Sequence, residues 1–195
     1  MPLSIHENLF ETVNPFTSRG AKFSTLKTGI SPKVELLHLY ISPGHNYFGH
    51  HGKPASENLI EEVSELECVS GCGIRGDRFF NFKESYKGQI TFFADEIYRE
   101  LCERLGVRKK TPAVFRRNVI TRGIDLSSLI GCEFELQGIR FRGTEECKPC
   151  YWMDQAFAPG AEATLKGRGG LRAQILTDGT LRISHSQNLS GCSIR

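Results

Sequence analysis

The second half of the chain is dominated by short apolar segments that are separated by glycine turns. Residues 132–145 alternate apolar and polar positions on either side of a Gln-Gly pair, and residues 172–184 do the same around Asp178-Gly179. A period of two is typical of strands, and an X-Gly pair between two such runs indicates a hairpin. We therefore expect two hairpins, the second pairing the residues on the two sides of Asp178-Gly179.

The remaining elements are fewer and more widely spaced. A helix is predicted over 94–106, because Ile97, Leu101 and Leu105 recur at helical spacing and Gly106 is a natural stop. Residues 63–69 fit either a strand or the end of a short helix. The glycines of 71–76 require an unusual backbone. Further strands are predicted at 34–41, 89–93 and 114–121.

Many short strands with glycine turns and one long helix define the expected fold class. We predict a mainly β (α+β) chain: a closed or partly closed mixed β-barrel with one longer helix and short helical turns. Residues 1–33 are expected to form an N-terminal arm or irregular cover. Residues 34–186 are expected to form the barrel domain, and 187–195 a C-terminal tail.

Composition excludes several classes of protein. Of the 195 residues, 39% are hydrophobic, enough for a core, yet no apolar run approaches the roughly 20 residues that a spanning helix needs. The N-terminus does not resemble a secretory signal, so a cytoplasmic location is expected. The seven cysteines are irregularly spaced, so most are expected to be reduced, with Cys102 and Cys132 as packing residues.

Charge is mild overall but locally clustered. A net charge of +3 does not predict nucleic-acid binding, and no membrane contact is expected. The arginines gather beside glycines, an arrangement that suits a small anionic ligand better than a long polyanion. They form three clusters: Arg75 with Arg78, Arg116 and Arg117 with Arg122, and Arg168 with Arg172.

The segment ECKPC, residues 146–150, holds two cysteines three positions apart. Three kinds of site fit this spacing. The pair is half of a zinc site completed by Cys68 and Cys72, a redox dithiol, or a single reactive thiolate directed at a cofactor. Lys148 and nearby arginines would lower a thiol pKa, whereas Glu145 and Glu146 would oppose this. Residues alone leave the three alternatives open.

Four segments, in order, resemble the MOSC domain family, named for the C-terminal module of molybdenum cofactor sulfurases. They are GIRGDRFF (73–80), RRNVITRGIDLSSLIGCEF (116–134), GTEECKPC (143–150) and GRGGLRAQILTDGTLRI (167–183). The resemblance extends over roughly residues 34–184 and is to stand-alone members. One departure is Ser184-His185, which stands where members usually have Gly-Asp.

This resemblance implies a MOSC-like barrel that binds the molybdenum cofactor, a molybdenum ion held by an anionic molybdopterin. It also implies Cys150 as the metal ligand and catalytic residue, in a reaction that reduces N-hydroxylated or N-oxide compounds. The small-molecule substrate would need an external electron donor protein. Pyridoxal phosphate is not expected, because no aminotransferase-like domain is present. The expected cofactor-binding residues are Arg117, Asn118, Arg122, Thr144, Arg78, Arg168, His45 and Asn46.

Two other functions remain open at this point. The first is a non-catalytic module that carries the molybdenum cofactor, or sulfur as a persulfide on Cys150. The second is a zinc-stabilised interaction domain. Strand alternation would also place the side chains of Arg117 and Asn118 on opposite faces, in conflict with both contacting one ligand unless a bulge or strand end intervenes.

Overall fold

The computed structural model describes residues 33–46, 54–188 and 190–194. The predicted N-terminal arm therefore lies outside the described residues, apart from Lys33. Among the described residues, no helix combines the length and apolar character needed to cross a bilayer.

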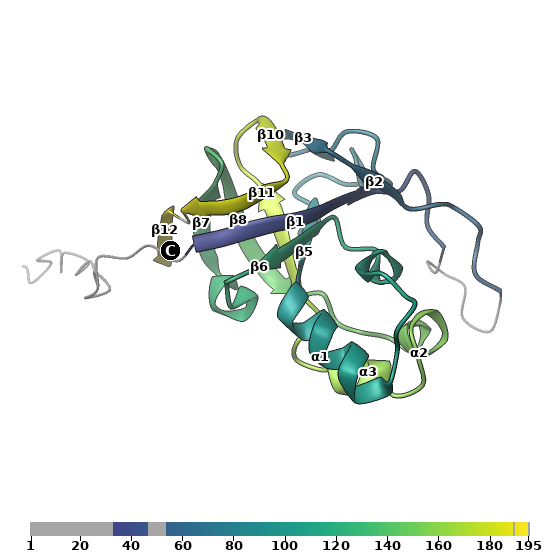
Figure 1. Cartoon of the computed structure of the whole chain (residues 1–195). Helices are drawn as coiled ribbons and strands as arrows, with labels where there is room; N and C mark the ends of the chain where they lie inside the picture. The colour runs from purple at the N-terminus through teal and green to yellow at the C-terminus, as the bar shows by residue number, and fades with distance from the viewer. Residues whose placement is uncertain (1–32, 47–53, 189, 195) are drawn as a thin grey trace, which may run out of the picture. The chain divides into compact units, whose positions relative to one another are not determined.

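The main sheet has nine strands and is mixed (Figure 1). Its order is β11-β1-β6-β5-β9-β8-β7-β12, with β2 paired to β1, and only β5 and β6 run parallel. This curled, mainly β sheet confirms the predicted fold class. Its strands are β1 (Lys33–Ile41), β2 (Glu61–Val63), β5 (Ile90–Ala94), β6 (Val119–Arg122), β7 (Cys132–Leu136), β8 (Ile139–Glu146), β9 (Leu171–Ile175), β11 (Ser184–Asn188) and β12 (Ser190–Ile194).

The first predicted hairpin is confirmed and the second is wrong. β7 and β8 pair around Gln137 and Gly138, which both have positive φ, as a tight two-residue hairpin turn requires. A smaller sheet contains β10 (Gly179–Arg182), β3 (Glu65–Val69) and β4 (Gly73–Ile74). Here β10 pairs with β3, whereas β9 pairs with β5 and β8. The Asp178 carboxylate accepts a hydrogen bond from the Ser70 amide at 2.7 Å, which ties the turn to the end of β3.

The predicted long helix is confirmed, but the strand predicted over 114–121 is only partly correct. Gly106 follows the long helix in the left-handed conformation, with φ of 66°. Residues before Val119 form a 3-10 turn, and Arg116 has φ of 55°, so the chain turns before β6 begins. The helices are α1 (Asp95–Leu105), α2 (Trp152–Ala156), α3 (Ala161–Leu165) and the 3-10 turns η1 (Pro112–Phe115) and η2 (Leu126–Leu129).

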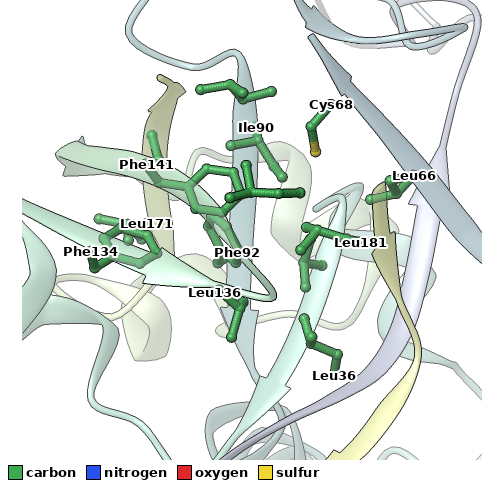
Figure 2. Packing of buried hydrophobic residues seen from close by; sticks show 14 of the residues in the cluster. Leu36, Leu66, Cys68, Ile90, Phe92, Phe134, Leu136, Phe141, Leu171 and Leu181 are labelled. Atoms are coloured by element: carbon green, nitrogen blue, oxygen red, sulfur yellow. The ribbon is translucent and has the colours of Figure 1, made fainter. Parts of the chain in front are cut away.

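Two apolar clusters cover the two faces of the sheet. The first fills the inside of the curl and includes Phe92, Phe134 and Phe141 (Figure 2). The second packs α1, α2, α3 and η1 against the other face. In β1, Leu36 and Leu39 both belong to the first cluster although they are three residues apart, because a register shift against β6 lies between Leu36 and His38. Simple alternation along β1 does not anticipate this shift.

Candidate functional site

A cavity of about 260 Å³ lies where four connecting segments meet at one end of the main sheet. One segment follows β1, two others come directly before β5 and β6, and the fourth joins β8 to α2. Five of the residues predicted for the site line it together. The lining residues are His45, Asn46, Arg78, Phe79, Tyr86, Gly88, Thr91, Phe115, Arg116, Arg117, Cys147, Lys148, Cys150, Trp152, Met153 and Arg172.

The charge of the cavity wall is one-sided. Four arginines and Lys148 are among the lining residues, and no Asp or Glu is among those that the structure describes. Arg78 lies over the ring of Phe79, 4.9 Å from its centroid, and pairs with the buried Asp77 at 3.2 Å. Burial lowers the pKa of Arg78, and Asp77 opposes this effect. The cavity therefore favours an anionic ligand.

Backbone carbonyls hold Arg117 in place. Its guanidinium donates to the carbonyl oxygens of Phe115 (2.9 Å), Cys147 (3.1 Å) and Gly169 (3.2 Å). These bonds connect the segment before β6 to the segment after β8. Arg117 thus positions the cysteine segment and also contributes charge to the cavity.

The two cysteines of 147–150 differ sharply in environment. Cys150 is exposed and Cys147 is buried, although both line the cavity. Burial raises the pKa of the Cys147 thiol, while Arg117 and Arg172 act in the opposite direction. Cys150 is therefore the thiol that an entering ligand meets first.

Aromatic rings form one wall of the site. The His45 ring packs edge-on against Phe79 at 4.8 Å, and Phe79 stacks with Tyr86 at 5.1 Å between centroids. Phe82 completes this aromatic cluster, 5.0 Å from Tyr86. Burial lowers the pKa of His45, and the charge of Arg78 adds to the effect. The lowered pKa favours the neutral form of the His45 imidazole near pH 7.

Asn118 is not among the lining residues of this cavity, and its predicted cofactor contact stays a prediction. Its side chain is buried next to the cavity, where Oδ1 accepts from the Thr91 amide (3.1 Å) and hydroxyl (2.8 Å). Its Nδ2 donates to the Tyr40 carbonyl and to the Asp77 carboxylate, both at 3.2 Å. Arg117 and Asn118 precede β6, so the predicted conflict with strand alternation does not arise.

Three other predicted cofactor-binding residues lie outside this cavity. Arg122 pairs with Asp95 at 2.7 Å and with Glu35 at 3.2 Å. Arg168 pairs with Glu100 at 2.7 Å and lines a different cavity. The Thr144 hydroxyl donates to the carbonyls of Lys87 and Arg172. The glycines next to these residues indicated a tight backbone, but they do not show that the side chains face a ligand. Arg122 and Arg168 instead form ion pairs with acidic side chains of α1 and β1.

Sequence reasoning missed several lining residues. Arg172 is the most informative of them, because its Nη1 lies 3.5 Å from the Tyr86 hydroxyl and 3.6 Å from Glu145. Both of these distances are long, and the guanidinium also hydrogen-bonds the Cys147 thiol, which helps to lower the pKa of that thiol. The sequence did contain a signal for two of the missed lining residues, because Arg116 and Arg172 belong to the arginine clusters. The sequence did not show which members of each cluster face the same space.

The four-cysteine zinc site has no support in the geometry. Cys68 is buried in the core inside the curled sheet, whereas Cys147 and Cys150 line the cavity. Within the described residues, no group of three or more His, Cys, Asp or Glu side chains is placed to hold a metal ion. Five cysteines are free thiols, whereas Cys132, expected to be a packing thiol, is disulfide-bonded.

The family model described as MOSC domain matches residues 49–186, more than half of the chain. The chain belongs to the MOSC domain family. The match includes all four sequence segments that resemble the family and most of the cavity lining. A search of curated proteins finds no relative of this MOSC chain.

Solved structures of similar fold extend the comparison. The YuaD protein from Bacillus subtilis aligns with a TM-score of 0.60 and 20% identity, over 80% of this chain and 94% of that one. YiiM from Escherichia coli aligns with a TM-score of 0.55 and 16% identity, over 83% and 70%. YiiM from Geobacillus stearothermophilus aligns with a TM-score of 0.53 and 13% identity, over 76% of this chain and 71% of that one. At these identities the likeness shows the fold alone.

The contrast between the two MOSC-segment cysteines predicts their reactivity. We expect a maleimide to label Cys150 at least about tenfold faster than Cys147, because a buried thiol is both shielded and harder to ionise. Mass spectrometry of the time course measures this. Cys150→Ser should remove the fast labelling of the peptide, and Cys147→Ser should retain it. Equal rates for the two thiols would contradict the assigned environments.

Proposed function

We propose that the cavity binds the molybdenum cofactor and that Cys150 is its protein ligand. The observation that carries this proposal is the meeting of one exposed thiol with four arginines in a single cavity. A thiolate is a soft ligand that suits a transition metal held by other sulfur atoms. Membership of the MOSC family supports the choice of cofactor.

The residues present fit this group. Molybdopterin carries a terminal phosphate, and guanidinium groups bind phosphate through paired, charge-assisted hydrogen bonds. Arg172 lines the cavity, where it has long contacts to Tyr86 and Glu145 and a hydrogen bond to the Cys147 thiol, and we assign its guanidinium to the anionic part of the ligand. Arg117, held by three carbonyls, would mainly fix the position of the cysteine segment.

We further propose that the chain reduces N-hydroxylated or N-oxide compounds. When bound, the cofactor supplies the two-electron chemistry. For an N-hydroxyl substrate, two electrons and two protons convert the N–OH group to N–H and release water. The chain holds the metal through the Cys150 sulfur. Both protons would come from solvent, because the lowered pKa of His45 on the cavity wall favours its neutral form, which is not a proton donor for this step.

A carrier role is the second candidate. The exposure of Cys150 favours it as well, because an exposed thiolate can attack the outer sulfur of a donor protein's persulfide, release the donor's thiolate, and pass the same sulfur on by the reverse exchange. This function requires the same cysteine but no electron donor and no substrate reduction.

Metal analysis and turnover separate the two functions. We expect the chain, produced in a host that makes molybdopterin, to contain close to one equivalent of molybdenum by elemental analysis. With dithionite and methyl viologen as reductant, the loaded protein should convert an amidoxime to the amidine. Molybdenum without turnover would support a module that carries the cofactor, and the absence of molybdenum would contradict both cofactor-binding proposals while leaving the sulfur carrier open.

A further inference from the structure

A group of cations lies between the end of α1 and η1. We call Arg104, Arg108, Lys109 and Lys110 the basic patch. All four are exposed, and within 103–110 the only acidic residue is Glu103. No ion pair between described residues involves a side chain of the basic patch, whereas Arg122 and Arg168 have acidic partners. Arg104 is close enough to Glu100 to help lower its pKa, so the excess of positive charge in the basic patch is carried mainly by Arg108, Lys109 and Lys110.

Lys110 connects the basic patch to the helix that borders the cavity. Its Nζ donates to the carbonyl oxygens of Ala156 and Phe157, both at 2.7 Å, at the end of α2. At the start of α2, Trp152 and Met153 line the cavity, and the Met153 amide donates to the Cys150 carbonyl at 2.8 Å. Helix α2 has five residues, so it extends only about 7.5 Å.

The surface beside Lys110 is formed mainly by small and uncharged residues. Gln155 and Pro159 are exposed on and just after α2, and Ala156 and Ala158 are partly exposed. One acidic side chain, Asp154, is on the same helix, and its carboxylate accepts from the Glu162 amide at 2.7 Å. A weakly polar surface with cations along one side resembles transient protein interfaces, in which a less polar centre has a polar rim.

We propose that the basic patch and the outer surface of α2 form the docking site for a small acidic electron-carrier protein. This inference rests on the proposed reduction, which needs two electrons from outside the chain. The carrier would be oxidised by one electron in each of two encounters, and the substrate would take up both electrons with two protons and lose water. Opposite charges accelerate such encounters and orient the partners. Lys110 contacts the end of α2 and Cys150 comes just before its start, so a carrier docked here would be separated from Cys150 by about the length of this short helix.

The test uses flavodoxin, an acidic one-electron carrier, reduced by its NADPH-dependent reductase. The variant is Arg108→Glu with Lys109→Glu, which reverses two charges of the basic patch and leaves Lys110 in place. The matched control is Lys33→Glu with Arg140→Glu, since both residues are exposed cations on strands of the main sheet with no described ion pair. Arg140 is also at the opposite end of β8 from the cysteine segment.

Four measurements give the expected result. At low salt, the basic patch variant should lose about tenfold or more in the flavodoxin-dependent rate at limiting carrier, and the control should change less than about twofold. The rate of the unmodified chain should fall as salt rises. Turnover with dithionite and methyl viologen should be unchanged in both variants. Flavodoxin binding to the cofactor-free chain, measured by biosensor, should weaken in parallel only in the basic patch variant.

The outcomes distinguish this inference from the function on which it rests. Normal dithionite turnover with no loss of flavodoxin-dependent rate or binding in the basic patch variant would overturn the docking site alone. An equal loss in the control variant would also overturn it, because the effect would then be one of net charge. Absence of dithionite turnover would count against the proposed reduction, and the binding measurement would still decide the docking site.

Discussion

Replacing Asn118 by alanine is expected to lower the free energy of unfolding by about 3–5 kcal/mol. The Asn118 side chain is 2% exposed and joins three parts of the fold. Its oxygen accepts from the amide and hydroxyl of Thr91 in β5, and its nitrogen donates to the Tyr40 carbonyl in β1 and to Asp77. Truncation leaves these buried groups without their partner, which costs about 1–3 kcal/mol for each group that water does not reach.

Urea unfolding followed by circular dichroism measures this loss. Thr121→Val is the matched control, because Thr121 is equally buried but its hydroxyl makes one long bond, 3.4 Å, to the Phe93 carbonyl. We expect the control to lose only about 1 kcal/mol. If Asn118→Ala is no more destabilised than the control, Asn118 is not the structural link described above, and its predicted ligand contact would be the favoured role.

Asn118 also explains how Asp77 takes part in the fold. The Asp77 carboxylate accepts from the amides of Ser42 and Phe79, at 3.2 and 3.1 Å, as well as from Asn118 and Arg78. It therefore fixes the glycine turn that carries Arg78 and Phe79 to the cavity wall. The loss of Asn118 should disturb the cavity indirectly, through this turn.

Local sequence signals predicted the elements whose structure is decided locally. The helix over 94–106 ends at Gly106 as expected, since a glycine in the left-handed conformation stops a helix wherever the helix packs. The Gln137-Gly138 turn likewise determines the pairing of the strands beside it. Both features depend on neighbours in the chain.

Features decided by distant contacts were not predictable in this way. The turn at Asp178-Gly179 looks like a hairpin, but Ser70, more than one hundred residues away, binds the aspartate, and β10 pairs with β3. Arg122 and Arg168 resemble ligand arginines until Asp95 and Glu100 of α1 are seen beside them. The arginine clusters predicted an anionic site, but not which arginines would face it.

Cys150→Ala is expected to reduce the molybdenum content of the purified chain at least about tenfold, and Cys147→Ser is expected to retain most of it. The reason is geometric, because Cys150 is exposed at the cavity whereas Cys147 is buried in its wall. Elemental analysis of both variants, produced in the same molybdopterin-making host, gives the comparison. Thermal unfolding should confirm that each variant is folded, since a misfolded chain would also lose metal.

The reverse result would reassign the ligand. If Cys147→Ser lost molybdenum and Cys150→Ala retained it, the buried thiol beside Arg117 and Arg172 would be the metal ligand, and the backbone after β8 would have to open for the cofactor to reach it. Zinc at one equivalent, lost on Cys68→Ser, would instead require the sulfur of Cys68 to leave the core inside the curled sheet. Among the cysteines that the structure describes, Cys150 is the one exposed at the cavity, so retention of molybdenum in Cys150→Ala would refute its proposed role as the metal ligand.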